Sequence, residues 1–120
     1  MARLRSALAL AAEVPAELRQ ESAEATLDRI VLADGTWTVL WHSILWQYLT
    51  QEQRAALSHR LAELGAAADD SAGFAHLRLE PTREARYLVT LTTWPGGTER
   101  VLGTATPHGI PVTWDAAAAG

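Results

Sequence analysis

Residues 37–44, WTVLWHSI, constrain the fold more than any other segment, because nearly all their side chains are β-branched or aromatic and apolar. A run of this length and composition predicts a β-strand. Its almost continuous apolar character is typical of a strand covered on both faces, as in a parallel sheet. Any fold for this chain must therefore place residues 37–44 inside a sheet.

A predicted helix follows this strand. Thr50-Gln51-Glu52-Gln53 has the Thr-x-x-Gln pattern of a capping box, in which each end of the motif accepts a hydrogen bond from a backbone N–H of the other. Leucines at helical spacing come next, and we expect Gly65 just past the helix end. These leucines are Leu57, Leu61 and Leu64.

The rest of the chain divides into short elements separated by Pro and Gly. Strict alternation over residues 74–80 predicts a strand with His76, Arg78 and Glu80 on the face opposite Leu77 and Leu79. Further predicted elements are helices at 2–13 and 23–33, a weak strand at 17–21, and strands at 86–94, 99–106 and 110–114.

The order of these elements predicts an α/β fold. Helices alternate with strands in the first two thirds, which favours parallel pairing, and the last strands form an antiparallel hairpin. We therefore expect a three-layer, mixed sheet within a single domain at 1–115, followed by a flexible tail at 116–120.

Composition excludes several classes of function. An apolar share of 48% with 20% charged residues is that of an ordinary globular protein, and no apolar run is long enough to cross a membrane. The basic residues are all Arg, scattered within a net charge of −4, which argues against nucleic acid as a partner. The chain has no Cys, and helical Leu spacing near the N-terminus argues against a signal peptide, so we expect a cytoplasmic protein.

His42 and Ser43 are the first candidates for a site, because they end the strand at 37–44. Ligands bind at the carboxyl ends of strands in open α/β sheets, so His42 is a candidate general base or ligand-orienting group. Neighbours on a strand point to opposite faces, which argues against a His42–Ser43 catalytic pair. The alternative is that both side chains satisfy backbone groups where the strand ends.

Glu80 and Tyr48 complete the candidate set. If the strands at 37–44 and 74–80 are parallel neighbours, Glu80 lies in the same crevice as His42 and sets its tautomer and pKa. The alternative for Glu80 is a surface ion pair with a nearby Arg, and for Tyr48 a packing role. The four histidines lack metal-binding spacing, so no metal site is predicted. They are His42, His59, His76 and His108.

Several motifs resemble the C-terminal part of an uncharacterised bacterial family, domain of unknown function 2332. They are His42-Ser43-x-x-Trp46-Gln47-Tyr48-Leu49, Gly65-Ala66, Leu77-x-Leu79-Glu80, Trp94-Pro95-Gly96-Gly97 and His108-Gly109 through Trp114. The element order is also similar to the second half of a class I, S-adenosylmethionine-dependent methyltransferase fold. The resemblance implies half of a methyltransferase-like Rossmann fold.

The resemblance also implies that a segment is missing. Members of that family are longer, and their N-terminal half carries a Gly-rich segment similar to a cofactor loop. Here Gly96-Gly97 follows a strand but opens no helix, so it reads as a hairpin turn. We expect no complete cofactor site on this chain, with S-adenosylmethionine and transferase activity implied by resemblance alone.

Three functions stay open at this point. The first is a methyltransferase-like half-domain that is inactive alone, and the second is a small enzyme with His42, Tyr48 and Glu80 in a crevice. The third is an interaction module that completes its sheet with another chain. The resemblance leaves residues 37–44 at a sheet edge, so either 17–21 pairs with them, or a second copy or the missing N-terminal half does.

Overall fold

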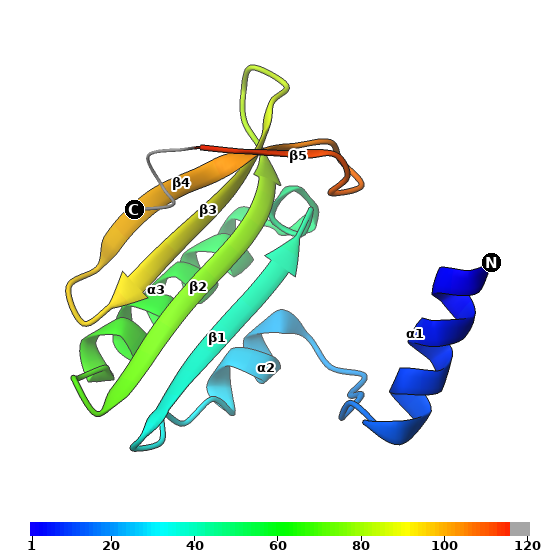
Figure 1. Cartoon of the computed structure of the whole chain (residues 1–120). Coiled ribbons are helices and arrows are strands. Elements are labelled where there is room, and N and C mark those ends of the chain that lie inside the picture. The colour runs from blue at the N-terminus through cyan, green and yellow to red at the C-terminus, as the bar shows by residue number, and fades with distance from the viewer. Residues whose placement is uncertain (116–120) are drawn as a thin grey trace.

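The structure is a computed structural model that describes residues 1–115. The predicted tail at 116–120 lies outside the described residues. Five strands form one sheet in the order β1-β2-β3-β4-β5 (Figure 1). In chain order the elements are α1 (Ala2–Glu13), α2 (Ala23–Asp28), β1 (Thr36–Ser43), a 3-10 turn η1 (Trp46–Tyr48), α3 (Gln51–Ala67), β2 (Ala72–Pro81), β3 (Tyr87–Trp94), β4 (Thr98–Ala105) and β5 (Val112–Trp114).

The sheet is mixed, as predicted. The apolar run of β1 pairs in parallel with β2, from Thr36 opposite Ala72 to Ser43 opposite Leu79. The other neighbouring strands pair antiparallel, and the turn at 95–97 joins β3 to β4 as the expected hairpin. A single parallel pair therefore sits at one side of an otherwise antiparallel sheet.

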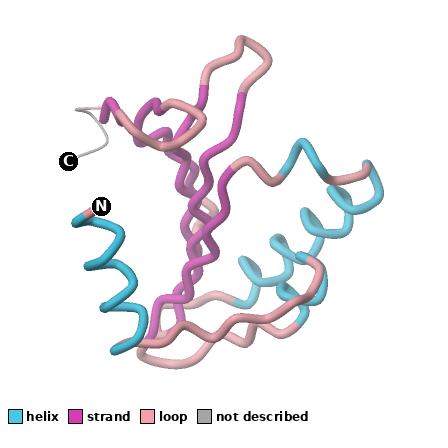
Figure 2. The backbone as a smooth tube through the Cα atoms, turned by 90° about the vertical axis from the view of Figure 1, so that its right-hand side faces the viewer, coloured by secondary structure: helices cyan, strands magenta, loops and turns pink. Residues whose placement is uncertain are grey.

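Helices α2 and α3 cover one face of the sheet (Figure 2). Their buried leucines pack on Phe74, whose ring stacks on Trp94 with 5.3 Å between the ring centroids. Arg60 of α3 donates hydrogen bonds to the carbonyl oxygens of Leu27 and Ile30, so it satisfies groups at the end of α2. The buried leucines are Leu27, Leu57 and Leu64.

The start of α3 confirms the capping box, and its end corrects the role of Gly65. Thr50 Oγ1 accepts from the Gln53 amide, and Gln53 Oε1 accepts from the Thr50 amide. The helix continues through Gly65 to Ala67. A Cβ at Gly65 would lie 2.5 Å from Trp94 Nε1, so this glycine allows close helix–sheet packing and is not a helix stop.

The expected three layers are wrong for the described residues. Helix α1 has the predicted bounds, but none of its residues is buried and it stands clear of the sheet (Figures 1 and 2). The second face of β1 is correspondingly bare, with Trp37, Val39 and Trp41 between 53% and 61% exposed. The expectation that β1 is covered on both faces is wrong for the same reason.

Strand β1 is at the edge of the sheet, as expected. Residues 17–21 form no strand, so they do not pair with β1. Helix α2 ends at Asp28, where the sequence predicted a helix to residue 33.

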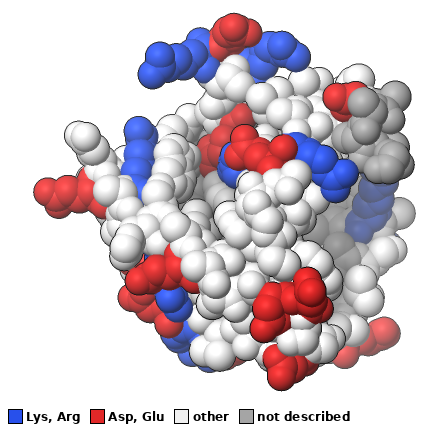
Figure 3. Space-filling view, turned by 90° about the vertical axis from the view of Figure 1, so that its left-hand side faces the viewer, with Lys and Arg blue, Asp and Glu red and all other residues white. Residues whose placement is uncertain are grey.

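No helix within residues 1–115 is long and apolar enough to span a membrane. On the face seen from the β4 side, basic and acidic side chains are interspersed and no continuous basic patch forms (Figure 3).

Candidate functional site

The parallel pairing of β1 and β2 brings their carboxyl ends together. Cα of His42 lies opposite that of Arg78, so His42 sits between His76 and Glu80, the alternate residues of β2 on the same face. That face is the one covered by α3. The site therefore forms where ligands bind in open α/β sheets, at the ends of parallel strands.

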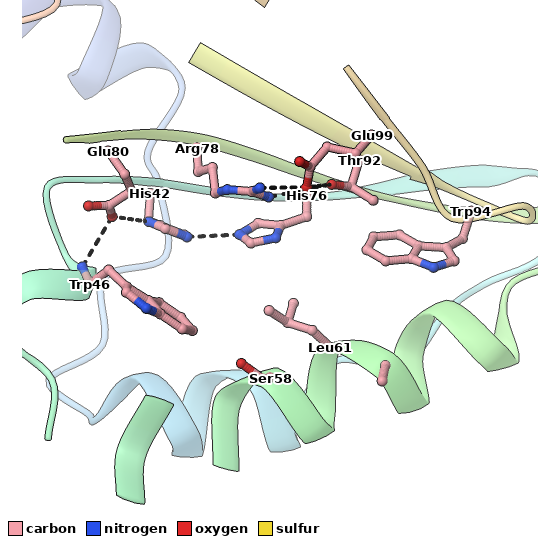
Figure 4. Close-up of a pocket in the computed structure, with 11 residues that line it drawn as sticks. His42, Trp46, Ser58, Leu61, His76, Arg78, Glu80, Thr92, Trp94 and Glu99 are labelled. Carbon is pink, nitrogen blue, oxygen red and sulfur yellow. Dashed lines mark hydrogen bonds and ion pairs between the residues drawn. The ribbon is translucent and has the colours of Figure 1, made fainter. Parts of the chain in front are cut away.

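Glu80, His42 and His76 form a continuous hydrogen-bonded series (Figure 4). Glu80 Oε1 lies 2.9 Å from His42 Nδ1, and His42 Nε2 lies 2.8 Å from His76 Nε2. The two imidazole rings are tilted by 40° with 4.9 Å between their centroids. This geometry joins the three side chains edge to edge.

The turn after β1 holds the Glu80 carboxylate in place. Its Oε1 also accepts hydrogen bonds from the amides of Leu45 at 2.9 Å and Trp46 at 3.1 Å. Ile44 makes this turn possible with a φ of 51°, a left-handed conformation that is costly for a β-branched residue. The other oxygen, Glu80 Oε2, is buried and has no partner among the described residues.

The hydrogen bonds of Glu80 indicate which nitrogen carries the proton in His42 and in His76. Glu80 Oε1 accepts two backbone N–H groups, so we assign the His42 Nδ1 atom as the third donor. His42 Nε2 then carries a lone pair and accepts from His76 Nε2–H. This leaves the lone pair of His76 on Nδ1, which has no hydrogen-bond partner in residues 1–115.

Burial keeps both imidazoles neutral at pH 7. It lowers the pKa of His76 to about 4, with the neighbouring His42 adding to the effect. Burial also lowers the pKa of His42, while the Glu80 carboxylate opposes that shift. A proton that enters this pair is therefore best stabilised on His42, beside the carboxylate.

The series lines a cleft of about 480 Å³ between the sheet and α3. Arg78 crosses its polar side, with Nη2 2.7 Å from Glu99 Oε2 and Nη1 3.4 Å from Thr92 Oγ1. Trp46 and Trp94 lie toward opposite ends, with His76 between them (Figure 4). The lining residues are His42, Trp46, Ser58, Leu61, Ala62, His76, Arg78, Glu80, Thr92, Trp94 and Glu99.

The structure brings together two of the four residues predicted from sequence. His42 and Glu80 are in contact, but Ser43 points to the opposite face and the Tyr48 side chain, 75% exposed, is not part of the cleft. Sequence reasoning missed His76, which was considered only as a metal ligand. Its alternation with Glu80 along β2 was the signal that placed it on this face.

A family described as an uncharacterised protein conserved in bacteria (DUF2332) matches residues 1–114. No curated protein and no solved structure matches the sequence. Because the match covers nearly the whole chain, the protein belongs to the DUF2332 family.

Proposed function

We propose that this chain carries an acid–base catalytic site, in which His76 removes a proton from a hydroxyl group or water bound in the cleft. The observation that supports it is the unbroken series from Glu80 through His42 to the free Nδ1 of His76. A carboxylate behind an imidazole fixes its tautomer and stabilises its cation, which is the arrangement that general bases require.

The proposed step moves two protons. The substrate O–H proton passes to His76 Nδ1, and the proton on His76 Nε2 passes to Nε2 of His42. His42 keeps its Nδ1–H and becomes the imidazolium, hydrogen-bonded to Glu80, while the substrate becomes an alkoxide or hydroxide. His76 is a weak base by itself because it is buried, and this relay leaves the positive charge on His42, beside the Glu80 carboxylate.

Hydrolysis of 4-nitrophenyl acetate tests this proposal, because the ester reports any activated water or imidazole. We expect wild-type protein to exceed free imidazole, and His76→Gln and His42→Gln to lower its rate at least about tenfold. His59→Gln is the matched control, since His59 is exposed on α3 and outside the cleft. A wild-type rate no higher than that of imidazole, or equal losses in all three variants, would contradict the proposal.

The tautomers offer a second measurement. Long-range ¹H–¹⁵N spectra at pH 7 should show the proton of His42 on Nδ1 and that of His76 on Nε2. The reverse assignment would leave no lone pair facing the cleft at His76 and would exclude it as the base.

A further inference from the structure

Three surfaces of this chain lack a partner within residues 1–115, and none belongs to the catalytic proposal. The first is the side of the sheet opposite α2 and α3, called here the open face. On it, Trp37, Val39 and Trp41 are more than half exposed. Trp41 also lines an apolar groove of about 440 Å³ next to the C-terminal segment, together with Leu77, Leu102 and Trp114. Contiguous apolar surface of this kind marks an interaction site.

The second surface is the apolar stripe of α1. Leu4 and Leu8, which are 56% and 62% exposed, lie one helical turn apart on the same side of α1, the spacing of a helix that packs on another surface. An isolated helix of 12 residues is marginal in water, because its nucleation is unfavourable. Helix α1 therefore needs a covering surface to be stable.

The third surface is the free edge of β1. Its sequence, TWTVLWHS, has no Lys, Arg, Asp, Glu or Pro, and these are the residues that normally prevent strand pairing between chains. The edge is eight residues long. It is thus open to pairing with another strand.

The position of α1 connects the three surfaces. Figure 1 shows α1 beyond the free edge of β1, and Figure 2 shows it on the side of the sheet away from the other helices. A sheet continued past β1 would therefore run beneath α1. At about 1.5 Å per residue the helix is roughly 18 Å long, which fits along a strand of eight residues, about 26 Å.

We propose that a second copy of this chain is the partner. The two β1 strands pair antiparallel about a two-fold axis, and α1 of each copy covers Trp37, Val39 and Trp41 of the other. A two-fold contact of this kind is self-complementary, so each copy contributes the same three surfaces. The side chains that the proposal uses lie outside the catalytic cleft, and only the backbone of β1, which also carries His42, is common to both.

Light scattering after size exclusion tests the assembly. We expect wild-type protein at twice the chain mass of 13.0 kDa. Leu8→Glu on α1 and Val39→Lys on β1 should each give monomers with unchanged circular dichroism in the sheet region. Leu18→Glu is the control, because Leu18 is 91% exposed in the segment between α1 and α2 and should leave the dimer intact. A monomeric wild type would overturn the proposal.

Cross-linking identifies the occupant of the open face. The chain has no cysteine, so Leu8→Cys and Val39→Cys each introduce one thiol. When the two variants are mixed, a short bis-maleimide should join one to the other. A third variant carries both substitutions in one chain. If its two thiols are joined within that chain, and the mixed single variants are not joined to each other, α1 covers the sheet of its own chain. A dimer that survives Leu8→Glu would limit the contact to β1, and either result would overturn the exchange of helices.

Discussion

At the scale of single residues, the lowered pKa of His76 should make the stability of the fold depend on pH. Its pKa is about 4 in the folded chain and 6.5 as an ordinary histidine. Between these values the unfolded chain binds more protons, so the free energy of unfolding should fall as the pH drops from 6.5 to about 4. The loss is at most about 3 kcal/mol and is absent above pH 6.5. The free energy of unfolding, measured with urea across this pH range, should depend less strongly on pH in His76→Gln than in the wild type. The same pH dependence in both proteins would refute a lowered pKa of His76.

Glu80 should control the titration of its neighbour. Glu80→Gln keeps an acceptor oxygen but removes the charge that opposes the effect of burial on His42. We expect the pKa of His42 to fall further in this variant, as measured by NMR titration of the imidazole. Glu63→Gln on the exposed side of α3 is the control and should leave it unchanged. A pKa of His42 that rises in Glu80→Gln would mean that the carboxylate is not its partner.

Half of this site was predictable from sequence. The polar ends of the runs at 37–44 and 74–80 predicted that His42 and Glu80 would meet if the strands were parallel, and they do. Ser43 and Tyr48 were candidates by proximity in sequence alone, which does not fix the direction of a side chain. The anchoring of Glu80 by the amides of the turn depends on the backbone at Ile44, and no residue pattern signals it.

At the scale of elements, Gly65 gives a prediction opposite to helix propensity. Replacing Gly by Ala inside an exposed helix usually stabilises it by up to about 1 kcal/mol. Here the new Cβ would lie 2.5 Å from Trp94 Nε1, so Gly65→Ala should instead destabilise the fold by roughly 1–3 kcal/mol. Ala66→Gly is the control, because Ala66 is exposed on the same helix and its replacement changes helix propensity without a contact to Trp94. It should also lower the free energy of unfolding. Chemical denaturation that finds Gly65→Ala more stable would show that Trp94 moves away freely.

Local sequence patterns predicted where helices and strands form better than they predicted which elements pack or pair with one another. The capping box at Thr50 and the alternation of 74–80 are confirmed because both depend on residues a few positions apart. Residues 17–21 were predicted as a strand and are not one, since a strand exists only where another strand can pair with it. The bare side of β1 could not be foreseen, because an apolar run looks the same whether or not a second layer covers it.

At the scale of the whole molecule, the sequence predicted a mixed sheet with a terminal hairpin, and the structure has one. The number of layers and the number of parallel pairs depend on packing between distant segments, so they were not predictable from local periodicity. Among residues 1–115 only β1 and β2 are parallel, and the connection from β1 to α3 has no glycine between residues 44 and 50. A nucleotide-type cofactor loop needs glycines at a strand-to-helix turn, where the backbone approaches the ligand closely.

This topology predicts the response to S-adenosylmethionine. The adjacent glycines, Gly96 and Gly97, lie in the hairpin between β3 and β4 and not at the start of a helix, so they present no helix N-terminus to a ligand. We therefore expect calorimetry to detect no saturable binding of S-adenosylmethionine or S-adenosylhomocysteine to this chain. Saturable binding would contradict this expectation, and Trp46→Ala locates it, because binding in the cleft between the sheet and α3 should be lost in that variant. Saturable binding that persists in Trp46→Ala would place a cofactor site outside the cleft, and the methyltransferase-like function would then need no further segment.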